Sequence, residues 1–248
     1  MDMRAEVYSP LQNTAVWLAA WLYGYEPTDS VLDAFTDLGG THTWDGGPLV
    51  DMLREIRAAA DIDGEEPVIR LILWGPGQAA GIPAGSQAAE ALTSAGALVV
   101  RGAGVSHILI PRYDEGGVAW RWFEEEERLP EPAWLSPGEA DRLLAQATDG
   151  AAALIEAIGY STDALPNPRL TVGTLADFYD TPGLPSSITP RAAKLFARAD
   201  RVAAIIETVT DRIGDHSLDP QLFALWRHIR TARMAGVADA VQDYWRDA

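Results

Sequence analysis

Apolar side chains recur three or four positions apart in residues 10–60 and again in residues 136–248. This spacing places them on one face of a helix, so it predicts three helices in the first segment and a helical region in the second. The most regular pattern covers residues 190–213, and a further helical pattern covers residues 219–244 after a short linker. We therefore expect a long antiparallel helix hairpin near the C-terminus.

Residues 68–124 have a different pattern, with short apolar or alternating runs separated by turn residues. Runs at 68–74, 97–101, 107–112 and 118–124 predict about four strands. The sequence Asp114-Glu115-Gly116-Gly117 predicts a hairpin between the last two strands. An Ala-rich helix is expected over 84–95, and Pro111 indicates an edge strand or a bulge.

A connector divides the chain into two predicted domains. Four glutamates at 124–127 lead into a Pro-containing segment, and Ser136-Pro137-Gly138-Glu139 then predicts a capped helix start. We expect an α+β protein with a small mixed sheet and N-terminal helices in residues 1–128. We expect a second, helical domain over 136–248, which could pack as one unit with the first domain. A short helix is expected at 174–179.

The chain is strongly acidic, with 36 Asp and Glu against 19 Lys and Arg and a net charge of −17. No cluster of basic residues is evident along the sequence, so nucleic acid and anionic membranes are disfavoured as partners. An acidic surface favours a basic protein partner. Lys194 is the only lysine, and such arginine usage favours a high-GC bacterium, such as an actinobacterium, over a halophile.

Cysteine is absent, which excludes disulfides, thiolate metal sites and cysteine nucleophiles. The N-terminus lacks the pattern of a signal peptide, and the apolar run at 15–25 is too short to span a bilayer. A cytoplasmic protein is therefore expected.

The Gly/Pro-rich segment 74–85 lies between a predicted strand and a predicted helix, where phosphate and dinucleotide sites form. Its glycines at 75, 77 and 81 are spaced one residue too widely for the dinucleotide fingerprint, and it lacks the lysine of a P-loop. Two prolines also remove backbone donors. The segment is either a structural connector or a ligand loop that uses Trp74, Gly75, Gly77 and Ser86.

A second glycine-rich segment, residues 39–47, is expected to be a loop that contains His42 and Asp45. These two could form an acid–base pair or bind a metal, or they could be a surface residue and a helix cap. The four histidines lie in separate elements, so no metal site is expected. No catalytic signature is present and no cofactor is indicated.

Tryptophan is frequent, with nine residues. Trp120 and Trp122 share one face of the second hairpin strand. Together with Trp74 they could line an apolar pocket, or they could fill the layer between sheet and helices. Arg112 is expected at the rim of such a pocket.

Two functional hypotheses remain. The first is a non-enzymatic protein that binds a protein partner, or self-associates, through its helical region. The alternative is a small-molecule-binding protein or enzyme whose site is formed by segments 74–85 and 39–47 with Arg112, Trp120 and Trp122. The alternative requires both glycine-rich segments to line one cavity.

Overall fold

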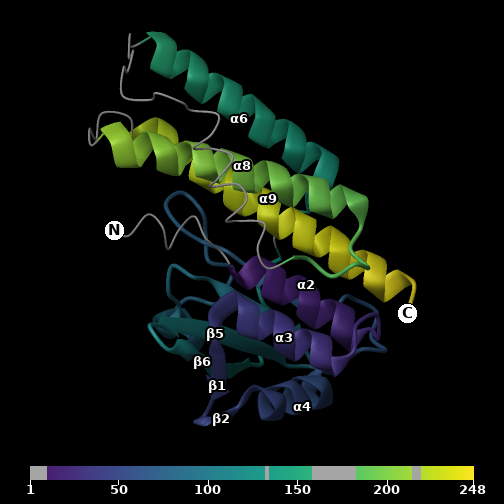
Figure 1. Ribbon diagram of the computed structural model, residues 1–248. Helices are drawn as coiled ribbons and strands as arrows, with labels where there is room; N and C mark the ends of the chain where they lie inside the picture. Colours follow the sequence, from purple (N-terminus) through teal and green to yellow (C-terminus); the bar gives the residue numbers. More distant parts are fainter. Residues whose placement is uncertain (1–9, 132–133, 158–182, 214–218) are drawn as a thin grey trace.

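The computed structural model describes residues 10–131, 134–157, 183–213 and 219–248. These residues form seven helices and six strands, so the fold is α+β as predicted. Figure 1 shows the sheet at one end of the molecule and a group of three helices at the other: α6 (Pro137–Ala157), α8 (Pro190–Ile213) and α9 (Asp219–Arg246).

The three predicted N-terminal helices are present as α2 (Pro10–Leu22), α3 (Thr28–Gly39) and α4 (Leu49–Ala59). Every residue of α2 except Trp17 is buried. This follows from its position, because α2 contacts the sheet and α3 as well as α9.

The sheet has six strands, two more than predicted. They are β1 (Thr41–Trp44), β2 (Gly47–Pro48), β3 (Ile69–Ile72), β4 (Ala97–Arg101), β5 (Ser106–Asp114) and β6 (Gly117–Glu125). Their order is β2-β1-β6-β5-β4-β3. Strand β1 runs parallel to β6, and all other neighbours are antiparallel.

The expectation of a loop at 39–47 was wrong, because this segment contains β1 and the first residue of β2. Thr41 to Trp44 pair with Gly117 to Trp120. A four-residue strand has too little alternation to be distinguished from a loop, and its partner strand lies far away in the sequence. The pairing is therefore visible only in three dimensions.

The helix predicted over 84–95 is limited to α5 (Gln87–Ala91). Ser86 caps it, since its Oγ accepts a hydrogen bond from the Ala89 N–H at 3.1 Å. Gly96 has a φ of +89°, and a Cβ at this position would overlap with the carbonyl oxygen of Ile72. The chain thus turns back into β4 instead of continuing the helix.

The predicted hairpin is formed by β5 and β6. In its turn, Asp114 Oδ1 accepts hydrogen bonds from the N–H groups of Gly116 (2.8 Å) and Gly117 (2.9 Å). Strand β5 is central in the sheet, but Pro111 lies beyond its pairing with β4 and is thus at a local edge, as predicted. The β4 pairing ends at Leu109, and the missing N–H of Pro111 therefore costs no hydrogen bond to β4.

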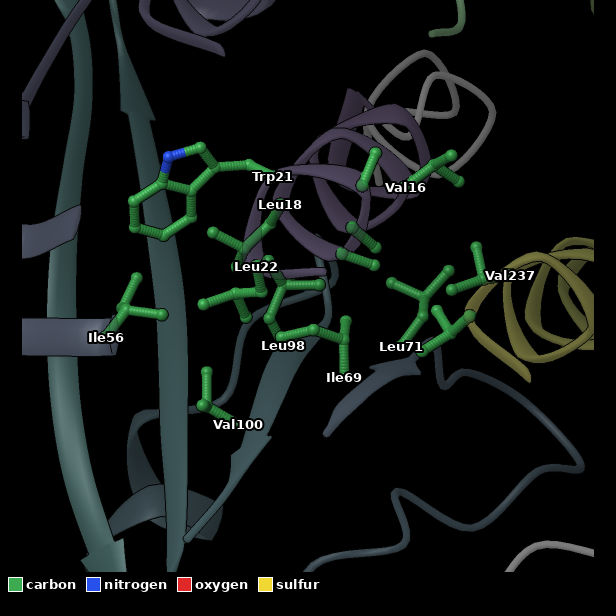
Figure 2. Packing of buried hydrophobic residues seen from close by; sticks show 14 of the residues in the cluster. Val16, Leu18, Trp21, Leu22, Ile56, Ile69, Leu71, Leu98, Val100 and Val237 are labelled. Carbon is green, nitrogen blue, oxygen red and sulfur yellow. The ribbon is translucent and has the colours of Figure 1, made fainter. Parts of the chain in front are cut away.

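Both faces of the sheet are buried over β3 to β5. Figure 2 shows the main core, in which Val16, Leu18 and Leu22 of α2 lie against side chains of β3 and β4, with Val237 of α9 beside them. On the opposite face, a smaller cluster joins the sheet to Ile82, Ala88 of α5 and Leu129. One face of the sheet thus packs against the α2–α9 side of the molecule, and the other packs against α5 and its flanking loops.

Side chains cap the first turn of α6, as predicted, and of α8. Ser136 and Glu139 form a capping box, in which the Ser136 N–H donates to the Glu139 carboxylate at 3.2 Å and the Glu139 N–H donates to Ser136 Oγ at 3.3 Å. Thr189 Oγ1 accepts from the Ala192 N–H at 3.2 Å at the start of α8. Helices α8 and α9 pack side by side in opposite directions (Figure 1). The short helix predicted at 174–179 lies outside the described residues.

Candidate functional site

A cleft of about 710 Å³ lies between the C-terminal half of α4 and strands near one edge of the sheet. Strands β1, β5 and β6 provide one wall, and α4 provides Glu55 and two alanines. The lining consists of Trp44, Asp45, Glu55, Ala58, Ala59, His107, Trp120, Arg121, Trp122, Phe123 and Glu124. Its size is within the range of small-molecule pockets, about 300–1,000 Å³.

Aromatic rings form the centre of this cleft. The rings of Trp44 and Trp122 have centroids 5.5 Å apart and are tilted by 44°. His107 meets Trp122 edge-on at 5.4 Å, and its Nδ1 accepts a hydrogen bond from Trp122 Nε1–H at 3.2 Å. Both tryptophans are half-buried and pack against the main core. The rings are therefore held in place from behind while part of their surface faces the cleft.

His42 and Trp120 form a second aromatic pair behind the cleft. Trp120 Nε1–H donates to His42 Nδ1 at 2.9 Å, and both side chains are buried. Burial lowers the pKa of His42 to about 4, opposed in part by the carbonyl of Phe35. His42 is thus neutral at pH 7 and fixes the Trp120 ring, which is a structural role rather than acid–base chemistry.

Three of the predicted site residues, Asp45, Trp120 and Trp122, therefore line one cleft, with His42 directly behind Trp120. Asp45 is brought there by the β1–β2 turn, where it has a φ of 49°. Glu55 and His107 were not among the predicted site residues. No local signal marks them, since they come from α4 and β5 and meet only in the folded sheet.

The other glycine-rich segment, 74–85, lies at the opposite side of the fold. It follows β3, which is one edge of the sheet, while β1 lies next to the other edge. The two segments therefore do not line one cavity, as the small-molecule hypothesis required. Trp74 is likewise separated from Trp120 by β4 and β5, and its indole N–H donates to the Thr93 carbonyl at 2.7 Å.

Segment 74–85 is held by a side chain from α9. Arg230 donates to Gln78 Oε1 at 3.0 Å and to the Pro76 carbonyl at 3.3 Å. A Cβ at Gly75 would lie 2.7 Å from the Arg230 guanidinium carbon, so a larger residue here would require the Arg230 head group to shift. Gly77 provides a positive φ of 75°, and Ser86 caps α5. These contacts support the interpretation of the segment as a structural connector.

Arg112 is exposed near the hairpin turn and does not line the cleft. The described part of the chain contains no group of three or more Asp, Glu or His side chains placed to hold a metal ion. None of the helices in that part is long and apolar enough to cross a membrane.

A groove of about 630 Å³ runs between α6 and α8. Four basic residues of α8 line one wall: Arg191, Lys194, Arg198 and Arg201. All four are exposed. We define them as the α8 basic stripe. The expectation that basic residues are not clustered was therefore wrong. The sequence does contain a signal for this cluster: the four basic residues are three, four and three positions apart, a spacing that places their side chains on one helix face.

The mixed sheet, its flanking helices and the C-terminal helical region together define an α+β protein. The aromatic cleft and the groove between α6 and α8 lie on different elements. Residues 12–134 match the family described as Rv1486c-like protein, N-terminal domain, and residues 138–234 match Rv1486c-like protein, C-terminal domain. The homologues of this chain are therefore Rv1486c-like proteins.

Two mycobacterial relatives illustrate the similarity. Uncharacterized protein Rv1486c of Mycobacterium tuberculosis (strain H37Rv) and uncharacterized protein ML1804 of Mycobacterium leprae are each 27% identical to this chain. Each alignment covers 97% of this chain and 100% of the relative. No solved structure matches.

Proposed function

We propose that this protein is a non-enzymatic, cytoplasmic interaction protein that binds an acidic segment of a partner protein in the groove between α6 and α8. The observation that supports this most directly is the α8 basic stripe. It gathers four of the 19 basic residues into eleven positions of a chain whose net charge is −17. A local charge opposite to the net charge points to a partner that is itself acidic.

Half of the stripe is engaged within the molecule. Arg198 pairs with Asp141 of α6 at 2.7 Å, and Arg191 lies 3.6 Å from Asp239 of α9. Lys194 and Arg201 form no ion pair with any described side chain. These two cations are therefore the ones offered to a partner.

The groove also has an apolar part. Leu195 and Val202 lie at its base, and Ile205 exposes 37% of its surface at one end. An amphipathic helix can place apolar side chains in such a groove and its charges along the rim. A partner helix with acidic residues beside an apolar stripe fits both properties.

The opposite wall favours a protein over a nucleic acid. It carries Asp141 and Asp149 of α6, so phosphates that approach the stripe also meet carboxylates. A peptide can present acidic residues to α8 only and leave the α6 wall to neutral ones. The net charge of the whole chain disfavours nucleic acid in the same direction.

The test is a charge reversal at the two unpaired cations. Lys194→Glu with Arg201→Glu should abolish capture of the partner from native lysate, and the captured protein should contain an acidic helical segment. A synthetic peptide of that segment should bind the wild type and weaken as the salt concentration rises. The matched control reverses Arg227 and Arg246, which are exposed on α9 and outside the groove.

Three results would overturn this proposal. The double reversal could leave partner binding unchanged, the groove could bind an RNA oligonucleotide instead, or light scattering could show that the groove mediates self-association without another protein. The competing small-molecule hypothesis loses its shared cavity, as described above. Of the two segments in that hypothesis, only residues 39–47 contribute to a cleft of suitable size, the one lined by Trp44 and Asp45.

A further inference from the structure

We propose that the cleft lined by Trp44 and Trp122 binds a small organic cation with an alkylammonium head group. This site lies on the sheet, on elements that do not contribute to the groove between α6 and α8. The proposal of cation binding is therefore independent of the proposed partner interaction, and each can be tested separately.

The aromatic walls provide the first part of the argument. Trp44 comes from β1 and Trp122 from β6, and their rings are 5.5 Å apart at an angle of 44°. Their partly exposed ring surface lines the cleft. The face of tryptophan attracts cations more strongly than that of any other side chain, because its ring quadrupole is negative at the face.

Three carboxylates line the same cleft as these rings. Asp45 comes from the turn after β1, Glu55 from α4 and Glu124 from β6, so three different elements each bring one negative charge to the same cleft. Arg121 is the one arginine of the lining, and its guanidinium lies over the ring of Phe123 at 4.8 Å. Side chains alternate along β6, so Arg121 and Phe123 project to the opposite face from Trp122.

The protein's own cations near α4 are used elsewhere. Arg57 lies over the Trp21 ring at 4.1 Å and donates to the Trp21 carbonyl at 3.2 Å. Arg54 pairs with Asp51 at 2.8 Å. Neither arginine lines the cleft. The aromatic rings and carboxylates are thus left to a cation from outside.

The remaining polar group of the cleft does not offset this charge. Burial lowers the pKa of His107, and the nearby Glu124 carboxylate opposes that shift only in part. His107 is therefore neutral at pH 7, with its Nδ1 accepting from Trp122. An anionic ligand would face three carboxylates, and the described residues do not form a metal-binding cluster. An organic cation fits both the rings and the charges.

Isothermal titration calorimetry on the full chain can test this with two compounds of nearly identical shape. Choline carries a quaternary ammonium, and 3,3-dimethyl-1-butanol has carbon in place of the charged nitrogen. We expect choline, or the diamine putrescine, to bind at least about tenfold more tightly than the neutral compound, the effect of one cation–π contact with partial desolvation. Equal affinity for choline and its neutral analogue, or no heat with either cation up to about 10 mM, would overturn the proposal.

Two variants place the binding in this cleft. Trp44→Leu keeps an apolar side chain but removes the aromatic face. Glu55→Gln replaces an exposed carboxylate with a neutral amide of nearly the same shape. Each should weaken cation binding by about fivefold or more. Glu115→Gln in the hairpin turn is the matched control, since it removes the same charge outside the cleft. If Trp44→Leu does not fold, Glu55→Gln and the comparison of choline with its analogue still decide the matter, and unchanged affinity in Glu55→Gln contradicts the site.

Discussion

His42 shows how one buried side chain can link stability to pH. It exposes 6% of its surface, and burial lowers its pKa from 6.5 to about 4. Between these two values the unfolded chain binds a proton that the folded protein does not. Stability is therefore fully present above pH 6.5 and is lost as the pH falls toward 4.

We predict that His42→Gln reduces this pH dependence. Gln can still accept from Trp120 but does not titrate. Between pH 7 and pH 5 the wild type should lose about 2 kcal/mol more unfolding free energy than the variant. Urea denaturation at both pH values measures the difference. Burial also lowers the pKa values of His107 and His228, which remain in both proteins, so their contribution cancels. Equal slopes in the two proteins would show that His42 is not buried in the neutral form.

Arg230 shows a different effect of a single residue. It is buried, comes from α9, and binds the segment that follows β3. The sequence predicted two alternatives for that segment, a connector or a ligand loop. The hydrogen bonds from Arg230 favour the interpretation as a structural connector. A contact with a residue so distant in the sequence cannot be predicted from the local sequence pattern.

At the scale of elements, the parallel pairing of β1 with β6 depends on one glycine. Gly117 begins β6 opposite Thr41 and has a φ of +154°. A Cβ at this position would overlap with the carbonyl oxygen of Thr41. Because β1 also carries His42, Trp44 and the turn to Asp45, this close approach helps to position one wall of the cleft.

Gly117→Ala should therefore lower the unfolding free energy by about 2–4 kcal/mol, since it combines an unfavourable backbone conformation with a steric overlap. Gly116→Ala is the matched control. A Cβ at Gly116 would meet only the Asp114 carboxylate at 3.4 Å, and we expect a loss of less than about 1 kcal/mol. Urea denaturation of the two variants tests this. Equal losses would show that the approach to Thr41 does not limit residue 117.

The α8 basic stripe is also a property of an element, because it exists only once the residues form a helix. The same helix presents Leu195, Ala199 and Val202 to the core, all buried. Core and stripe thus use different faces of one helix. The acidic composition of the chain did not indicate the α8 basic stripe, because a net charge contains no information on how the charged residues are grouped.

At the scale of the whole molecule, the two predicted domains share buried surface. The main core contains side chains of α2 and the sheet together with Phe196 of α8 and Val241 of α9. A buried polar contact accompanies it, in which Arg233 of α9 donates to Asp200 of α8 at 2.5 Å and to Gln12 of α2 at 3.0 Å. Whether residues 1–128 and 136–248 fold as separate domains stays a prediction, and the shared core favours one cooperative unit.

Arg233→Met should then destabilise both parts together. It leaves the buried Asp200 carboxylate without this guanidinium, which costs about 3 kcal/mol. Six of the nine tryptophans lie in residues 1–128, so their fluorescence reports mainly on that part of the chain, while far-ultraviolet circular dichroism reports on the helices of both parts. Both signals should shift to the same lower urea midpoint. Separate midpoints would indicate two domains that unfold independently. Asp200→Leu added to Arg233→Met should recover part of the loss, because it removes the buried carboxylate that has lost the Arg233 guanidinium.

The sequence by itself determined what depends on neighbouring residues. It predicted the helices at both ends of the chain, the Ser136–Glu139 capping box, the hairpin turn at Asp114 and the shared face of Trp120 and Trp122. Each of these results from spacing, caps or turn chemistry within a few residues, and these interactions are the same in any fold.

Only the tertiary structure decided which distant segments meet. It paired β1 with β6, placed the two glycine-rich segments at opposite sides of the sheet, and brought Glu55 and His107 to the tryptophans. These outcomes depend on strand order and on packing between residues far apart in the sequence. Local patterns cannot encode such contacts, because the burial that selects them exists only after the chain has folded.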